Sequence, residues 1–513
     1  MKKSEAYWPL ILLLALIKFV LPLFLQSSIY ELQRDEYLYY EQGQHLALGY
    51  LENPPLLSWL GYISSWFGGS EAWIKFWPCL FGAATLVVTC LITAEFGGGR
   101  FAQFLAGLGI ITGAFLRVHF LFQPNILDIF SWTLAIYFLV RYINTGNPAF
   151  VYWIVISVVI GWWGKYSILF LAAGMLAGIL MTKHRILFTK KQSWLALLLG
   201  LILVAPNIFW QFQHKWPLVH HMQELQETQL QFLDPADFFK EQLLLLFPVV
   251  FVWIIGLVWL LRRRNYRIVA FVYFIIIILL IAGRGKSYYA LGIYPALLAA
   301  GATAIESATR QGAWKRYAIT ILVLVLSLPL VPVLLPVYPP EKLSRFYKQI
   351  GIDKLGLLRW EDQRDHALPQ DFADMLGWKE LTAKAEGFYN TLDDSTQSNT
   401  IIYGRHYGHA GALLYYGKNR QFRENVFTDN GSFLQWIPDN KPFTNLLFIG
   451  RNKPGSDDEV FNHFESSRLV DTVDNIYSRQ FGDRIIFYEK LDSSGWKLAV
   501  NGLKEMKKEF QRD

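Results

Sequence analysis

The stretch YWPLILLLALIKFVLPLFL, residues 7–25, decides the fold class, because it is apolar over the length that a helix needs to cross a bilayer. The 513-residue chain is 53% hydrophobic, which is more than a soluble protein of this size normally shows. Comparable apolar runs lie near residues 7–25, 76–94, 101–117, 125–142, 150–163, 166–182, 194–210, 243–261, 268–283, 287–305 and 318–336. The first run has no small-residue cleavage site after it, so we expect a retained helix and not a signal peptide. The sequence therefore predicts an α-helical polytopic membrane protein with about eleven transmembrane helices.

The composition changes near residue 337, where the chain becomes charged and contains Gly and Asp, with no further spanning run. Strand-like runs such as NTIIYG (399–404) and NLLFIG (445–450) favour a mixed α/β structure. The segment GWKLAVNGLKEMKKEF (495–510) is amphipathic and basic. We predict a transmembrane domain over residues 1–336 and a soluble C-terminal α/β domain over residues 337–513.

The basic clusters of the chain indicate its orientation, since short loops rich in Lys and Arg stay in the cytoplasm. If the connections alternate from a cytoplasmic N-terminus, the cytoplasmic set holds Arg100, Arg141 and the clusters at 182–191, 262–267 and 308–316. The opposite set holds single cations only. Eleven spans then place the C-terminal domain outside the cytoplasm. The net charge of +7 follows this topology and does not indicate a nucleic-acid surface.

Several function classes lack sequence support. No Walker A loop, H-E-x-x-H, CxxC or Rossmann glycine pattern occurs in a suitable setting. The only cysteines, Cys79 and Cys90, lie in one predicted helix at a separation of about 16 Å along its axis, so they cannot bridge each other. ATP use, hydride transfer and a cysteine metal site are therefore not indicated.

The first outer loop carries the dipeptide Asp35-Glu36 directly after Arg34. Neighbouring side chains point in different directions, so at most one of the two carboxylates faces a given cavity. A carboxylate beside the membrane can act as a general base towards an attacking hydroxyl. Alternatively, the pair forms a salt bridge with Arg34 or lies in a solvated loop.

Two more outer segments present polar side chains from defined backbone. In QPNILDIF (123–130), Pro124 suits the first position of a helix, which places Asp128 near the positive end of the helix dipole. In LENPPLL (51–57), two prolines fix the backbone after Glu52 and Asn53. A helix-start carboxylate and a structural turn would explain these residues equally well.

Cations at the same predicted face suit a phosphate ligand. GRGKSYY (283–289) places Arg284 and Lys286 beside glycines between two apolar spans, and GWWGKYS (161–167) places Lys165 beside tryptophans. Arg offers a fork of donors and Lys a compact charge. Snorkelling to lipid head groups is the alternative reading.

These motifs together resemble a known family. The sequence is similar to bacterial integral-membrane glycosyltransferases of family 39, which are related to protein O-mannosyltransferases and to the aminoarabinose transferases that modify lipid A. The resemblance covers roughly residues 1–310 and rests on the following ordered segments: RDEYLYYEQGQHLALGYLENPPLL (34–57), QPNILDIFSW (123–132), GWWGKYSILFL (161–171), PNIFWQFQHKWP (206–217) and GRGKSYYALGIYPALLAAGA (283–302). YGRHYGHAGALLYYG (403–417) resembles a stretch in the tail of bacterial members.

The resemblance implies a GT-C fold and transfer of a sugar from a polyprenyl-phosphate carrier, typically with inversion, to an acceptor outside the cytoplasm. It implies Asp35 as the catalytic base, Glu36 as its companion and Asp128 as a second acidic position. The positions that it implies for donor or phosphate binding are Glu52, Asn53, Lys165, Arg284, Lys286 and Tyr289. At the position of Asn53, aminoarabinose transferases usually have a Lys that contacts the phosphate. The Asn in this sequence argues against aminoarabinose specificity and shifts the phosphate-binding role towards Lys165 or Lys286.

We therefore expect a glycosyltransferase in a bacterial inner membrane, with lipid A, a protein hydroxyl or a cell-envelope glycan as acceptor. Its partners would be the polyprenyl-phosphate donor, membrane lipid and that acceptor, without nucleic acid. The sequence identifies no cofactor, and a divalent metal such as Mg or Mn could bridge Asp35 or Asp128 to phosphate. The alternatives are a lipid or glycolipid transporter (flippase) and a non-catalytic polyprenyl-lipid-binding subunit. Transporters place charges near the bilayer midplane and carry internal repeats; here the charges gather at one rim.

Overall fold

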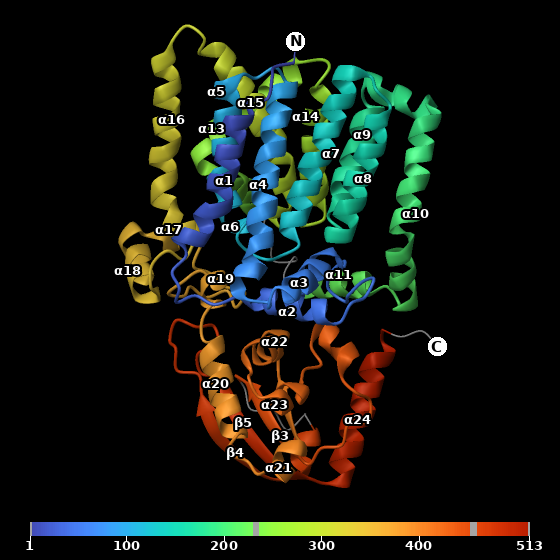
Figure 1. The fold of residues 1–513 in the computed structure, drawn as a ribbon, viewed down its shortest axis with the longest axis vertical. Coiled ribbons are helices and arrows are strands. Elements are labelled where there is room, and N and C mark those ends of the chain that lie inside the picture. The colour runs from blue at the N-terminus through green and yellow to red at the C-terminus, as the bar shows by residue number, and fades with distance from the viewer. Residues whose placement is uncertain (1–2, 229–234, 452–458, 511–513) are drawn as a thin grey trace.

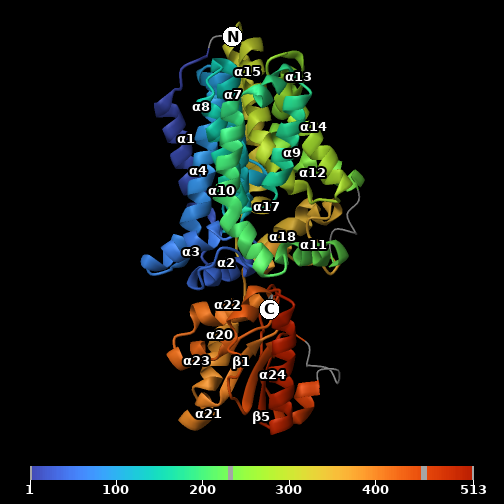
Figure 2. The ribbon, with the colours of Figure 1, turned by 90° about the vertical axis from the view of Figure 1, so that its right-hand side faces the viewer.

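The computed structural model describes residues 3–228, 235–451 and 459–510. Figure 1 shows a tall bundle of helices with a smaller α/β part beneath it, and Figure 2 shows the same two parts from the side. The helices at the eleven predicted apolar runs are α1 (Trp8–Leu25), α4 (Glu71–Glu95), α5 (Arg100–Ile111), α7 (Asn125–Thr145), α8 (Ala149–Gly164), α9 (Ile168–Leu180), α10 (Lys191–Gln213), α13 (Val250–Arg262), α14 (Arg267–Ala282), α15 (Tyr294–Ala308) and α16 (Ala313–Ser327). The predicted polytopic helical class is confirmed.

Fewer than eleven of these helices meet the length and composition expected of an unbroken membrane span. In the part of the chain that the structure describes, six helical segments are long and apolar enough to cross a membrane, or eight if each of two bent pairs forms one span. Helices α5, α8 and α14 are shorter. The run at 101–117, for example, breaks where Gly113 adopts a positive φ of 65°, so α5 ends at Ile111 and a separate short helix follows. An apolar run measures composition only, and it does not reveal such a turn.

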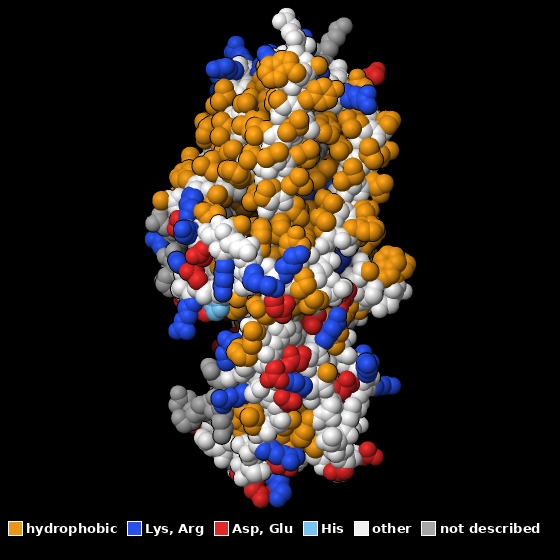
Figure 3. Space-filling model, turned by 90° about the vertical axis from the view of Figure 1, so that its left-hand side faces the viewer, with side chains coloured by type: hydrophobic (Ala, Val, Ile, Leu, Met, Phe, Trp, Pro, Cys, Tyr) orange, Lys and Arg blue, Asp and Glu red, His pale blue; other side chains and the backbone are white. Residues whose placement is uncertain are grey.

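Apolar side chains cover the flank of the bundle, while Lys, Arg, Asp and Glu gather at its ends and on the lower part (Figure 3). Many large hydrophobic side chains on the bundle are exposed, such as Phe24 at 82% and Leu328 at 66%. A flank of this kind faces lipid in a membrane protein, since a soluble protein rarely exposes so large an apolar surface.

Short helices lie at the end of the bundle next to the α/β part (Figure 1). They are α2 (Arg34–Gln44), α3 (Leu56–Trp66), α6 (Ala114–Val118), α11 (Pro217–Thr228), α17 (Val331–Leu334), α18 (Pro340–Ile350) and α19 (Gln370–Ala373). Helix α12 (Pro235–Leu245) lies higher on the bundle, below α14 (Figure 2), and forms one of the bent pairs with the helical segment Phe247–Arg262. The N-terminus lies at the opposite end of the bundle. We call the end that carries α2 and α3 the domain-facing end.

The lower part has the α/β character that the sequence predicts, and its helices pack on a mixed five-stranded sheet. Its elements are α20 (Trp378–Tyr389), α21 (Asp394–Ser398), β1 (Thr400–Gly404), α22 (Tyr407–Tyr416), α23 (Arg420–Glu424), β2 (Val426–Phe427), β3 (Asn445–Gly450), β4 (Phe464–Thr472), β5 (Arg484–Leu491) and α24 (Ser493–Lys508). The strand order is β2-β1-β3-β5-β4, parallel across β2, β1 and β3 and antiparallel beyond. Every residue of the central strand β3 is buried, which explains its uninterrupted apolar sequence.

One hydrophobic cluster joins the bundle end to this sheet. Tyr37 and Leu38 of α2 are buried in the same cluster as Trp378 of α20, Leu413 of α22 and Phe487 of β5. A second cluster packs residues 333–376 against the bundle end through Tyr30, Leu116 and Phe120. The boundary between residues 336 and 337 stays a prediction, and the two parts share a continuous core there.

A buried ion pair fixes α2 at the bundle end. Lys75 of α4 donates to both carboxylate oxygens of Glu36 at 2.7 Å, and both side chains are almost fully buried. The same carboxylate accepts the backbone N–H groups of Gln33 and Phe122, each at 2.7 Å. The Glu36 side chain therefore connects α2, α4 and the loop before α7 through four hydrogen bonds.

We expect Glu36→Gln to lower the free energy of unfolding by roughly 3–5 kcal/mol, because it leaves the Lys75 ammonium buried without its partner charge. Thermal unfolding in detergent measures the loss. The control is the double variant Glu36→Gln with Lys75→Met, which removes both charges and should recover part of the stability. Equal melting temperatures for wild type and Glu36→Gln would contradict this role.

Glu31 joins the bundle to the α/β part by capping α20. Its Oε2 accepts the N–H groups of Trp378 at 2.9 Å and Lys379 at 3.0 Å. Burial raises the pKa of the Glu31 carboxyl from about 4.5 to about 7, against the opposing effect of these backbone donors. The folded protein thus holds the Glu31 proton more tightly than the unfolded chain does.

The free energy of unfolding should therefore fall by up to about 3 kcal/mol through Glu31 as pH rises from about 4.5 to about 7. Below this window the contribution is fully present, and above it the ionised carboxylate is buried at a cost. Melting temperatures at pH 5 and pH 8 measure the effect. We expect Glu31→Gln to lose less stability over this interval than wild type; identical losses would refute the assignment.

Candidate active site

The candidate site begins at the first turn of α2. Gln33 is the N-cap, and its side chain accepts the N–H of Asp35 at 2.8 Å, while the Glu36 side chain accepts the N–H of Gln33. This reciprocal capping box fixes where the helix starts. It also points the two neighbouring carboxylates in different directions, because Glu36 is buried against Lys75 whereas the Asp35 side chain stays 22% exposed.

Asp35 lies between three segments of the chain. Its Oδ1 accepts a hydrogen bond from Tyr407 Oη at 2.6 Å and one from Arg34 Nε at 3.2 Å. Its Oδ2 accepts from Gln123 Nε2 at 3.3 Å. Asp35 is therefore an oriented and partly accessible carboxylate, which is the state that a general base requires.

A second group of predicted residues lies at the start of α7. Asp128 is buried, and its Oδ1 accepts from Trp132 Nε1 at 2.8 Å. Lys165, at the end of α8, donates to Asn125 Oδ1 at 2.6 Å and lies with its Nζ 4.1 Å from the ring centre of Tyr289. Lys165 is close enough to Asp128 for their charges to interact.

Lys286 connects these two groups electrostatically. Its charge interacts with the carboxylates of Asp35 and Glu361 and with Arg34. The Tyr39 hydroxyl of α2 lies within electrostatic range of Asp35 and Tyr289. The fold thus brings Asp35, Lys286, Tyr289 and Lys165 to the same end of the bundle. Arg284, from the same loop as Lys286, has an exposed side chain.

Glu52 and Asn53 make contacts of a different kind. Glu52 accepts the N–H of Ser432 at 2.7 Å and the Ser432 hydroxyl at 2.5 Å, both across the junction with the α/β part. Gln42 donates to Glu52 and to Asn53 at 3.0 Å each. These bonds hold the turn after α2 in place. Phosphate binding by Glu52 and Asn53 stays a prediction.

Charged residues that sequence reasoning missed surround Arg34. Arg479, from the segment before β5, donates to Asp374 at 3.1 Å and to Glu361 at 3.0 Å. Although burial opposes it, the charges of Arg34 and Arg479 lower the pKa of Glu361. Burial raises the pKa of Asp374 to about 6. No local sequence signal identifies these partners, because they come from segments hundreds of residues away from Arg34.

The predicted metal has no assigned place. Among residues 3–228, 235–451 and 459–510, no three His, Cys, Asp or Glu side chains come together in a way that could hold a metal ion. The oxygens of Asp35 instead accept hydrogen bonds from Tyr407, Arg34 and Gln123. Dependence on Mg or Mn stays a prediction.

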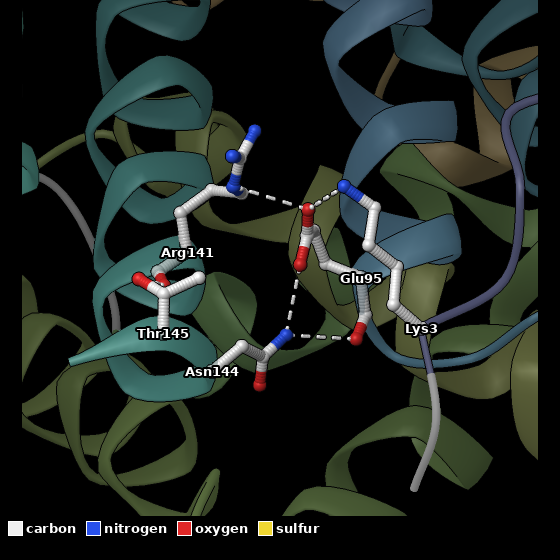
Figure 4. Close-up of a pocket in the computed structure, with 5 residues that line it drawn as sticks. All are labelled: Lys3, Glu95, Arg141, Asn144 and Thr145. Atoms are coloured by element: carbon white, nitrogen blue, oxygen red, sulfur yellow. Dashed lines mark hydrogen bonds and ion pairs between the residues drawn. The ribbon is translucent and has the colours of Figure 1, made fainter. Parts of the chain in front are cut away.

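A pocket of about 190 Å³ lies at the opposite end of the bundle (Figure 4). Glu95 is buried there between Lys3 at 2.7 Å and Arg141 at 3.2 Å, and Asn144 donates to it at 2.9 Å. Since the carboxylate neutralises charge on both cations, this cluster ties the N-terminal segment to α4 and α7. It contains none of the predicted site residues.

Parts of the sequence match known proteins. Residues 52–210 match the sequence profile of the family described as dolichyl-phosphate-mannose-protein mannosyltransferase. The lipid A galacturonosyltransferase RgtD of Rhizobium johnstonii is 24% identical over 225 residues, which cover 42% of this chain and 47% of that protein. The chain thus matches about half the length of this curated relative.

The fold is that of a solved membrane protein. The crystal structure of ArnT from Cupriavidus metallidurans bound to undecaprenyl phosphate superposes with a TM-score of 0.61 at 11% identity and covers 94% of this chain and 98% of that one. Its apo state gives the same TM-score at 12% identity, with 94% and 97% covered. At this identity the likeness concerns the fold alone.

Proposed function

We propose that this protein transfers a sugar from a polyprenyl-phosphate carrier to a hydroxyl group of an acceptor, at the domain-facing end of the bundle. The observation that carries the proposal is the position of Asp35, a partly accessible carboxylate oriented by three donors, at the same end as Lys165 and Lys286. Transfer from a sugar phosphate needs a base for the incoming hydroxyl and positive charge for the departing phosphate.

In the proposed reaction Asp35 accepts the proton of the acceptor hydroxyl as its oxygen bonds to the anomeric carbon. The bond from that carbon to the phosphate oxygen breaks on the opposite face, which inverts the anomeric centre. The polyprenyl phosphate leaves with the electron pair, and its negative charge meets Lys165, Lys286 and the Tyr289 hydroxyl. The phosphate is a good leaving group, so no strong general acid is required.

Glu36 acts in this proposal by holding α2, since its oxygens are occupied by Lys75 and two backbone donors. Asp128 acts by holding Lys165 near the carrier, because its charge interacts with that of Lys165. The distribution of Lys and Arg along the chain supports an extracytoplasmic site in a bacterial inner membrane. Since the matching relative is named a lipid A galacturonosyltransferase, lipid A is the first acceptor to test.

The test reconstitutes wild type and Asp35→Asn with polyprenyl-phosphate sugars and candidate acceptors. We expect Asp35→Asn to lower the rate of transfer by roughly a hundredfold or more, while carrier binding and the melting temperature stay as in wild type. Lys165→Met serves as the matched variant and should weaken carrier binding.

Sugar transfer at the wild-type rate by a folded Asp35→Asn protein would contradict the role of the base. Transport of the carrier without transfer would instead support the flippase. Carrier binding with neither activity would support a non-catalytic subunit.

A further inference from the structure

Helix α22 of the α/β part lies directly against α2 of the bundle (Figure 1). Two glycines of α22 permit this approach. A Cβ at Gly411 would meet the Tyr37 Cβ at 2.7 Å, and one at Gly408 would meet the Arg34 Cγ at 2.7 Å. Since real Cβ atoms do not approach so closely, only glycine lets the start of α22 reach the first turn of α2.

The close approach brings the Tyr407 hydroxyl onto Asp35. The Oη···Oδ1 distance is 2.6 Å, across a separation of 372 residues in sequence. The backbone N–H of Tyr407 donates to Asn430 Oδ1 at 3.2 Å, and the Arg34 guanidinium lies 5.5 Å from its ring centre. Burial, followed by the charge of Asp35, raises the pKa of Tyr407, so its hydroxyl keeps the proton that it donates.

Three donors from the described residues bind the two oxygens of the Asp35 carboxylate. A carboxylate has about four lone-pair positions. Tyr407 and Arg34 occupy those of Oδ1, and Gln123 occupies one on Oδ2. In the proposed reaction the acceptor hydroxyl donates its proton to the remaining position on Oδ2, and the bonds to Oδ1 fix the direction in which the Asp35 carboxylate faces.

We propose that Tyr407 is a positioning residue for Asp35, and that the C-terminal α/β domain thereby completes the reaction centre. The inference rests on the proposed function of Asp35 as the base. In this arrangement the C-terminal domain contributes a hydrogen bond to the group that accepts the proton, in addition to any contact that it makes with the acceptor.

The test compares Tyr407→Phe with a control on the same helix and the same junction. Tyr416, at the other end of α22, accepts a hydrogen bond from the Tyr37 hydroxyl at 3.0 Å and donates one to Glu71 of α4 at 3.0 Å. Both substitutions remove one hydroxyl between the α/β part and the bundle, but only Tyr407→Phe removes a bond to Asp35.

With a polyprenyl-phosphate sugar as donor, we expect Tyr407→Phe to lower kcat by roughly ten- to a hundredfold through misplacement of the base. The KM for the donor should stay within about twofold of wild type, because the cations that meet the phosphate are untouched. Tyr416→Phe should keep the wild-type kcat. Melting temperatures in detergent show whether each variant is folded.

A wild-type kcat for a folded Tyr407→Phe protein overturns the inference, and so does an equal fall in kcat for both variants, which would indicate loosened docking. If Tyr407→Phe does not fold, a fluorinated tyrosine can replace Tyr407. It changes the hydrogen-bond donor strength of the hydroxyl, while the side chain keeps nearly the same size. A changed kcat then supports the inference and an unchanged kcat overturns it. If the wild-type protein itself transfers no sugar, the proposed function fails. That outcome is separate from the ones above, which compare each variant with an active wild type.

Discussion

The position of the candidate site depends on the buried ion pair between Glu36 and Lys75. Burying two charges costs several kcal/mol, and the cost is offset only where geometry and further hydrogen bonds are good. Here both Glu36 oxygens accept from Lys75 at 2.7 Å, and each accepts one backbone N–H as well. Because these bonds join α2 to α4 and to the loop before α7, they hold the first turn of α2 against the end of the bundle.

That constraint gives two adjacent carboxylates opposite properties. Glu36 has its oxygens filled and is inaccessible, whereas Asp35 faces the junction with the α/β part and stays 22% exposed. The sequence argument that at most one of the pair faces a cavity is consistent with this arrangement. Lys75 and the backbone of Phe122 determine which carboxylate is buried, because both bind Glu36. No local sequence pattern shows that these two residues lie next to α2.

The sequence was most informative where a signal is local. Apolar runs predicted the helices, and NTIIYG and NLLFIG predicted β1 and β3. The span count was less reliable, because the turn at Gly113 interrupts a run that remains apolar throughout. Tyr407 lay inside a segment that already resembled the family, yet its contact with Asp35 spans 372 residues and requires the close approach at Gly408 and Gly411.

In the proposed reaction the carrier phosphate binds at the domain-facing end, between Lys165 and Lys286 and within reach of Asp35. A cryo-electron microscopy structure of the protein with undecaprenyl phosphate tests it most directly. We expect phosphate density within hydrogen-bonding distance of at least one of these lysines. Density at the opposite end of the bundle, beside Lys3 and Arg141, would contradict it.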